Sequence, residues 1–287
     1  MVNKKDNRKR CESHMKSKIN SIIIHIIMIS LALIWIYPYA WLFISSVKPA
    51  DQIYDNFIPT KFTLEHYKFI LNSAEKMDRP FIRGFFNSLF VSLTVTLIVI
   101  FTSALISYAL TKLQFKGRKQ IINFIIFQMV FPSFMFTIPM YILIRNLGLV
   151  DTYTSLIVPS MISGWGIFMM QQSFKTTPND YIEAAKLDGA KDLWIIFKVM
   201  MPLNKSAISI VGLFTFIGIW DNFMWPLIVM KNYNKMPLSV LLASFNTQYG
   251  AYLGPVLAGS VIQTLPMVII FILFRKYYLE GISISLK

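Results

Sequence analysis

Six long apolar stretches constrain this chain more than any other feature of its sequence. Each has about 20 residues, the length that a helix needs to cross the roughly 30 Å hydrocarbon core of a bilayer. Charged residues make up only 15% of the 287 residues, whereas a soluble domain carries roughly 25%. Together these observations predict an all-α integral membrane protein with six transmembrane helices. The expected spans cover approximately residues 21–44, 85–110, 121–144, 154–172, 207–229 and 255–274.

The distribution of basic residues predicts the orientation of these spans. Lys and Arg number 28, against 14 Asp and Glu, and in membrane proteins such an excess gathers in the short cytoplasmic loops. The two termini and the 111–120 and 173–206 loops hold 19 Lys and Arg, whereas the three loops on the opposite side hold 9. Both termini are therefore predicted to be cytoplasmic. We assign the excess to membrane topology rather than to nucleic-acid binding.

One cytoplasmic loop, residues 173–206, is too long and too patterned to be a simple connector. Thr177 is a candidate N-cap, Pro178 suits a first helical turn, and Gly189 is a typical helix end. A second apolar stretch follows from Asp192 and is expected to end at Pro202. The loop is thus predicted to contain two short helices hinged at Gly189. It could be a solvated connector or a docking element for a cytoplasmic protein, with its apolar residues Ile182, Leu187, Leu193, Ile196 and Phe197 anchoring it to the membrane helices.

The spacing within this loop resembles that of a known family. Glu183-Ala184-Ala185, then Gly189 and then Pro202 are similar to the EAA loop of binding-protein-dependent ABC importer permeases. Other segments resemble the carbohydrate branch, in particular the smaller maltose-type permease. They are Ser46-Val47-Lys48-Pro49, Phe62-Thr63-Leu64-Glu65-His66-Tyr67, Asn87-Ser88-Leu89, Leu147-Gly148-Leu149-Val150-Asp151-Thr152 and Trp220-Asp221-Asn222-Phe223-Met224-Trp225-Pro226-Leu227. In family members the acid usually follows the asparagine, whereas here Asp221 precedes Asn222.

The resemblance implies a type I ABC importer permease fold and a role in a larger machine. It implies a second homologous permease subunit, two ATPase subunits and an external solute-binding protein, assembled in the lipid bilayer of a bacterial plasma membrane. ATP and Mg²⁺ would bind to the ATPase subunits, because this chain lacks a glycine-rich phosphate loop with Lys-Ser/Thr. We therefore expect no enzyme activity, no cofactor and no metal site in this chain. The implied regions are a basic cytoplasmic leader (1–20), a first helix with an external loop (21–84), a permease core (85–278) with its EAA loop (177–202), and a cytoplasmic tail (279–287).

Three groups of candidate functional residues follow from the resemblance and from the polar residues within the spans. The expected ATPase-coupling residues are Glu183, Ala184, Ala185, Gly189 and Pro202. Residues that could line the substrate path are Gln128, Ser133, Asp221, Asn222 and Gln263, although hydrogen bonding or packing between helices would also explain them. Candidate contacts with the binding protein are Tyr233, Asn246, Gln248 and Tyr249.

Other functions stay open at this point. The same kind of importer could carry another solute, such as glycerol phosphate, but strong anion selectivity would favour Lys or Arg inside the spans. A secondary transporter driven by an ion gradient would need paired ionisable groups at mid-membrane and usually repeated halves. Neither pattern is visible in the sequence, so uptake of a sugar or oligosaccharide is the preferred interpretation.

Overall fold

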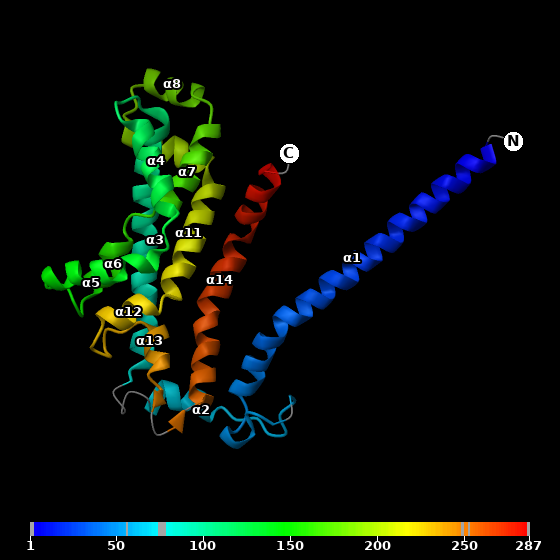
Figure 1. Cartoon of the computed structure of the whole chain (residues 1–287), viewed down its shortest axis with the longest axis vertical. Helices are drawn as coiled ribbons and strands as arrows, with labels where there is room; N and C mark the ends of the chain where they lie inside the picture. Colours follow the sequence, from blue (N-terminus) through cyan, green and yellow to red (C-terminus); the bar gives the residue numbers. More distant parts are fainter. Residues whose placement is uncertain (1–2, 56, 74–78, 248–249, 252, 286–287) are drawn as a thin grey trace. The chain divides into compact units, whose positions relative to one another are not determined.

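The computed structural model describes residues 3–55, 57–73, 79–247, 250–251 and 253–285, and this part of the chain is almost entirely helical (Figure 1). Its only strands in these ranges are β1 (Asn246–Thr247) and β2 (Gly250–Ala251), which pair antiparallel. The chain divides into two compact units. Unit 1 contains the chain up to Tyr67 together with Leu253–Val261, and unit 2 contains Lys68–Tyr252 together with the chain from Ile262.

Unit 1 is built on α1 (Asn3–Ser46), followed by the 3₁₀ turn η1 (Ala50–Gln52) and the start of α2 (Glu65–Lys68). The apolar side chains of α1 are exposed along the stretch Lys18–Ser46, as expected for a helix surrounded by lipid. After α1 the chain folds back on itself. His66 donates from Nε2 to the Lys48 carbonyl (2.8 Å), and Thr63 N donates to the Val47 carbonyl (2.8 Å). Two of the family-like segments of the sequence are therefore in contact.

Unit 2 is centred on α3 (Phe81–Lys112), which packs against α7 (Gly164–Thr176) and α11 (Lys205–Trp220). The interface combines buried apolar side chains with small ones, which allow helices to approach closely in a membrane. Gly166 of α7 shows this, because a Cβ placed on it would lie only 2.8 Å from Ser103 Oγ of α3. The core of unit 2 includes Val95, Val99, Tyr108, Met170, Phe174 and Val211.

All six predicted spans contain helices; the third and fourth are bent, and a further bend lies at Asn204, before the fifth. Helices that are long and apolar enough to cross a membrane cover Lys18–Ser46, Phe81–Lys112 and Leu253–Lys276, the last within α14 (Leu253–Ser285). By length and composition, three bent helix pairs can each supply one more span, for up to six. The bends are 97° between Arg118–Met129 and Ser133–Asn146, 41° between Tyr153–Ser160 and Gly164–Thr176, and 88° between Asp192–Leu203 and Lys205–Trp220.

Two of the predicted spans differ from the structure in a way that proline explains. The third, expected as one helix over 121–144, is divided into α4 (Arg118–Met129), the 3₁₀ turn η4 (Ser133–Phe136) and α5 (Thr137–Asn146). The break lies at Pro132, which disfavours helical geometry in the residue before it. The fifth span does not run to residue 229, because α11 ends at Trp220 and a separate helix, α12 (Met224–Val229), follows. In a continuous helix the ring of Pro226 would clash with the backbone carbonyl of Asn222, four residues earlier, so the helix is interrupted before Pro226.

Short elements complete unit 2. The π turn η2 (Phe69–Ser73) precedes α3, and α6 (Tyr153–Ile157) with η5 (Val158–Ser160) precedes α7. After α7 come α8 (Asp180–Leu187), α9 (Asp192–Ile195), the π turn η6 (Ile196–Met200) and α10 (Met201–Leu203), and α13 (Leu238–Ala243) lies between α12 and β1. Within unit 2, α8 lies beyond one end of α3, and α13 packs beside its other end (Figure 1).

Candidate functional site

The predicted pair of short helices is present at one end of unit 2, and we call residues 178–203 the elbow. α8 ends at Leu187, and Gly189 then adopts a left-handed conformation with φ of +80°. The amide of Ala190 donates to the Ala185 carbonyl (2.9 Å), and that of Gly189 donates to the Lys186 carbonyl (3.0 Å). This is the geometry by which a glycine closes a helix and turns the chain. The second helix begins at Asp192, as predicted, and ends at Leu203 rather than at Pro202.

The start of the elbow is held differently from the prediction. Thr177 does not cap α8, because its Oγ1 accepts a hydrogen bond from Asn204 Nδ2 (2.9 Å). Asn204 is buried, and it also accepts from Ser173 Oγ (2.6 Å) and donates to the Met200 carbonyl (2.7 Å). Asn204 therefore joins the end of α7 to the start of α11. The sequence analysis missed this residue, because the partners that give it its role lie far away in the sequence.

Several large apolar side chains of the elbow are exposed beside its charged ones. The side chains of Ile182, Ile195 and Ile196 are buried against unit 2. Leu187, however, is 89% exposed and Leu193 is 60% exposed, so the prediction that they anchor the elbow to the membrane helices is wrong. Exposed apolar side chains that gather on one short segment make it a candidate interaction surface. We call the exposed set of Tyr181, Leu187, Leu193 and Trp194 the elbow surface.

A groove of about 760 Å³ lies in the elbow, lined by Tyr181, Ala185, Asp188, Gly189, Ala190, Lys191, Trp194 and Val199. Of the five predicted coupling residues, Ala185 and Gly189 line this groove. Glu183 and Ala184 are exposed on α8, and Pro202 is exposed on α10. The predicted residues are thus accessible, but they are spread over more than one side of the elbow.

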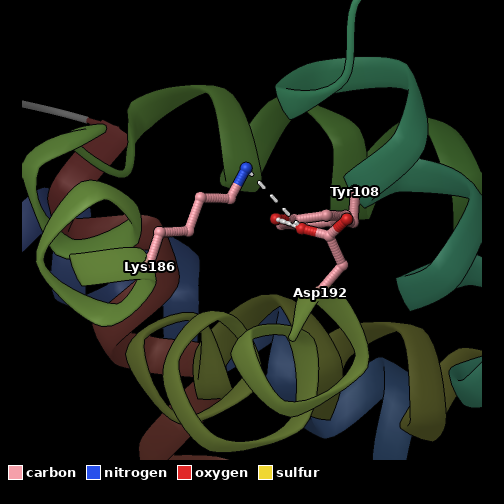
Figure 2. Close-up of polar contacts among 3 residues, drawn as sticks. All are labelled: Tyr108, Lys186 and Asp192. Atoms are coloured by element: carbon pink, nitrogen blue, oxygen red, sulfur yellow. Dashed lines mark hydrogen bonds and ion pairs between the residues drawn. The ribbon is translucent and has the colours of Figure 1, made fainter. Parts of the chain in front are cut away.

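A cluster of polar side chains joins the elbow to α3 (Figure 2). The Tyr108 hydroxyl donates to Asp192 Oδ1 (2.8 Å), and Lys186 Nζ lies 3.7 Å from the same oxygen. These side chains come from α3, α8 and α9, so the Asp192 carboxylate connects both helices of the elbow to the core. Because the Lys186–Asp192 pair is about half exposed, we expect the tyrosine hydrogen bond to contribute more to this connection than the ion pair.

Three of the predicted substrate-path residues meet at one cavity. Gln128 of α4, Ser133 at the α4–α5 break and Asn222 at the α11–α12 break line a cavity of about 550 Å³. Aromatic side chains and one proline supply half of the remaining lining residues. The other lining residues are Phe134, Phe136, Thr137, Met140, Pro159, Ser160, Met224 and Trp225. The breaks in the bent spans therefore place polar groups beside open space, where irregular backbone is tolerated at membrane depth.

The other two predicted path residues lie together but do not line this cavity. Gln263 Nε2 approaches Asp221 Oδ1 at 3.5 Å, the outer limit of a hydrogen bond. The Gln263 carbonyl accepts from Trp220 Nε1 (3.0 Å). This geometry favours the packing interpretation of Asp221 and Gln263, in which they link α11 to α14.

On the opposite side of unit 2 from the elbow, Asp151 holds a loop in place. Its carboxylate accepts from the backbone amides of Lys231 and Asn232, each at 3.0 Å, and Lys235 Nζ donates to its carbonyl (3.0 Å). Its φ of +63° is a conformation that aspartate tolerates better than most residues. Burial alone would raise the pKa of this carboxyl, but the Asn232 and Lys231 amides and the charges of Lys235 and Lys231 outweigh burial and lower the pKa.

The lowered pKa of Asp151 predicts a specific pH dependence. A carboxyl whose pKa is lower in the folded state stabilises the fold above its unfolded pKa of about 3.9, and that contribution is lost as pH falls through the folded pKa. We expect Asp151→Asn, which keeps an acceptor oxygen and tolerates the same φ, to lower the unfolding midpoint at pH 7 by about 1–3 °C. The difference from wild type should shrink as pH falls through the folded pKa of Asp151, which lies below the ordinary value for an aspartate. Thermal unfolding of the purified protein from neutral to strongly acidic pH measures it, and a constant difference would contradict the assignment.

The candidate contacts with a binding protein are only partly described by the structure. Tyr233 is half-buried, and the Arg79 guanidinium lies over its ring at 4.6 Å from the centroid. Asn246 belongs to β1, and its side chain lies outside the described part of the structure, as do Gln248 and Tyr249 entirely. Among the described residues, no group of three His, Cys, Asp or Glu side chains is arranged to hold a metal ion.

Comparison with known proteins agrees with this geometry. Residues 100–278 match the model of the family described as binding-protein-dependent transport system inner membrane component. The arabinooligosaccharides transport system permease protein AraQ of Bacillus subtilis is 30% identical over 269 residues, which is 92% of this chain and 94% of that protein. The lactose transport system permease protein LacG of Rhizobium radiobacter is 26% identical over 275 residues, 95% of this chain and 98% of that protein.

A solved structure shows the same fold. It belongs to a bacterial ABC transporter involved in the import of the acidic polysaccharide alginate, and it superposes with a TM-score of 0.80 at 24% sequence identity. The match covers 91% of this chain and 97% of that chain. The chain therefore has the fold of a known ABC transporter chain.

Proposed function

Because this chain belongs to the family of binding-protein-dependent transport system inner membrane components, we propose that it is the permease subunit of an ATP-driven importer for a sugar or oligosaccharide. Two similar permeases are described as transporting arabinooligosaccharides and lactose. A homologous second permease subunit would complete the path, and an external solute-binding protein would deliver the solute. The 19 to 9 distribution of Lys and Arg supports cytoplasmic termini in a bacterial plasma membrane.

The elbow surface carries the proposal that the chain is driven by a separate ATPase. Leu187, Leu193 and Trp194 are exposed on the two helices of the elbow, and their being apolar supports a partner protein that covers them. The chain lacks a phosphate-binding loop of its own, so ATP and Mg²⁺ would bind to the partner. In this proposal the ATPase subunit receives the elbow in a cleft. Closure of the ATPase pair then moves the bent spans and changes which side of the membrane the cavity faces.

The chemistry of the 550 Å³ cavity supports a neutral, hydroxyl-rich solute. Among the described residues, those lining it offer amide and hydroxyl groups beside aromatic rings and carry no charge. Amides and hydroxyls match the hydroxyls of a sugar, and Trp225 and Phe136 could pack against its apolar faces. A glycerol phosphate importer would instead need cationic side chains at this position. An ion-coupled transporter would need paired ionisable groups there, which the lining does not provide.

Uptake by a strain deleted for this chain tests the proposal. A panel of radiolabelled oligosaccharides, with glycerol 3-phosphate as the alternative solute, is offered to the deletion strain and to the complemented strain. The proposal predicts that uptake of at least one neutral sugar depends on the chain and on ATP, and that an ATPase subunit purifies with it. Uptake that persists after ATP depletion but stops on collapse of the ion gradient would contradict it.

One substitution tests the cavity itself. Asn222→Ala removes an amide that lines the cavity, and we expect about a fivefold rise in the apparent KM for the imported sugar, because a net hydrogen bond contributes about 1 kcal/mol. Asp221→Asn is the matched control, since Asp221 is the neighbouring residue but lies outside the cavity lining. Equal effects of the two substitutions would show that this cavity is not the path.

A further inference from the structure

Polar side chains tie α3 to a different segment at each of its ends. One end contacts the elbow, and the other contacts the loop 231–238 between α12 and α13. Most of the packing of α3 is against other long helices, α7 and α11. The contacts at its ends are different in kind, because they join α3 through polar side chains to the short helices of the elbow and to the loop.

Tyr108 and Lys112 hold the elbow, and we call this pair the elbow clamp. Tyr108 is only 1% exposed, and its hydroxyl donates to Asp192 Oδ1 (2.8 Å). Lys112 Nζ donates to the Thr177 carbonyl (2.7 Å) and to Asn179 Oδ1 (2.8 Å). Thr177 and Asn179 precede α8, whereas Asp192 begins α9. The two side chains therefore hold the elbow at its entrance and at its hinge.

Asn87 and Ser88 hold the loop at the opposite end, and we call this pair the loop clamp. Asn87 Nδ2 donates to the carbonyls of Asn234 (3.0 Å) and Met236 (3.1 Å). Ser88 Oγ accepts from the Leu238 amide (2.7 Å). Both clamp residues are buried, and buried polar groups paired in this way fix one conformation because leaving them unpaired is costly. The loop can therefore shift relative to α3 only by breaking these hydrogen bonds.

The helix between the clamps is continuous. Asn87 and Tyr108 are separated by 21 residues of unbroken α3, about 32 Å at 1.5 Å per residue, which matches the roughly 30 Å thickness of the hydrocarbon core. α3 contains no proline, whereas the other candidate spans of unit 2 either are bent pairs or, in α14, contain Pro266. When one end of a bent helix pair is displaced, the bend can change its angle and the other end can stay in place. In a continuous helix, a displacement of one end moves the other end as well.

We infer that α3 transmits movement of the elbow directly to the loop 231–238 on the other side of the membrane, with Tyr108, Lys112 and Asn87 as positioning residues. This rests on the proposed function, in which an ATPase subunit moves the elbow. The same movement of the elbow then has two effects. The bent spans change the access to the cavity, and α3 moves the external loop. Since the loop adjoins the candidate contacts with the binding protein, nucleotide binding inside would alter the surface offered outside.

Hydrogen–deuterium exchange on the complete importer tests this inference without knowing the sugar. The assembly is compared without nucleotide and after trapping with MgATP and vanadate, and exchange is followed in peptides covering the elbow and the loop 231–238. In the wild type, both peptides should change their exchange on trapping. In Tyr108→Phe/Lys112→Met, which keeps side-chain size but removes the clamp donors, the change at the loop should fall at least about fivefold while the elbow still responds.

Two further variants separate transmission from general loosening of the helix. Asn87→Leu/Ser88→Ala removes the hydrogen bonds of the loop clamp and should abolish the loop response while leaving the elbow response intact. Thr102→Val is the matched control, because it removes a mid-helix hydrogen bond to the Met161 carbonyl (3.0 Å) and touches neither clamp. Thr102→Val should respond as the wild type does at both peptides.

The possible outcomes distinguish the two levels of the proposal. If the elbow of the wild type shows no response to trapping, the proposed function fails and the inference fails with it. If the elbow responds but the loop does not, or if the loop still responds in both clamp variants, only the inference is overturned. A loss of loop response in Thr102→Val equal to that in the clamp variants would also overturn it, because the clamps would then have no special role.

Discussion

Gly189→Val is expected to abolish ATP-driven uptake while leaving the amount of protein in the membrane unchanged. No atom lies within 4 Å of the position that a Cβ on Gly189 would take, so there is room for a side chain. The obstacle is φ of +80°, a left-handed conformation that costs residues with a Cβ about 1–2 kcal/mol and is especially unfavourable for β-branched ones. The elbow would change its angle rather than keep this strained turn, and the elbow surface would no longer fit its partner.

Two control variants make this prediction specific to the elbow. Gly189→Asn should retain most of the uptake, because asparagine tolerates the left-handed region. Gly117→Val imposes a similar strain at φ of +90°, also with open space around it, but in the turn before α4. It should not impair uptake to the same degree. Initial uptake rates normalised to permease content measure the effect, and equal loss in Gly117→Val would point to general misfolding instead.

Leu187→Glu is expected to separate the ATPase subunit from the permease. Leu187 is 89% exposed, so its replacement should leave the thermal stability of the chain nearly unchanged. If it inserts into a cleft of the ATPase, a buried charge there would weaken binding by about 2 kcal/mol or more, or roughly 30-fold, as at other interface hot spots. Titration of the ATPase subunit against detergent-solubilised permease gives the dissociation constant.

Leu147→Glu is the matched control for this second experiment. Leu147 is also an exposed leucine, at 59%, but it follows α5, on the other side of the membrane in the predicted topology. It should bind the ATPase as the wild type does. Unchanged affinity in Leu187→Glu would mean that the elbow surface contacts something other than the ATPase, and the coupling proposal would lose its main support.

Much of the architecture could be predicted because it depends on local composition. Runs of about 20 apolar residues predict membrane helices, and the helix–glycine–helix elbow follows from Pro178, Gly189 and the apolar stretch after Asp192. The bends were harder to place. Pro132 and Pro226 disfavour helical geometry in the residues before them. Apolar residues continue on both sides of each break, however, so the hydropathy pattern predicts a single span.

The errors at the elbow have a different physical origin. Thr177 was predicted as a helix cap from its local neighbours, but Asn204, 27 residues away, competes for its hydroxyl. Leu187 and Leu193 were predicted to be buried because apolar residues in a single chain normally face its core. Here they face outward. The burial preference of apolar residues within a single chain does not predict this, because their partner in the proposal is another protein. The Tyr108–Asp192 hydrogen bond, across 84 residues, was likewise beyond any local pattern.

Asn204 has a consequence for how such a protein can change over evolutionary time. Because the last turn of α7 and the first residues before α11 share one buried amide, the intervening segment leaves and rejoins the membrane body at a single point. Substitutions at the exposed positions of this segment can therefore alter the surface that it offers to the proposed ATPase while α7 and α11 stay joined through Asn204. Its buried and clamped positions, such as Ile195 and Asp192, do not have this freedom, because they pack against or bond to the membrane helices.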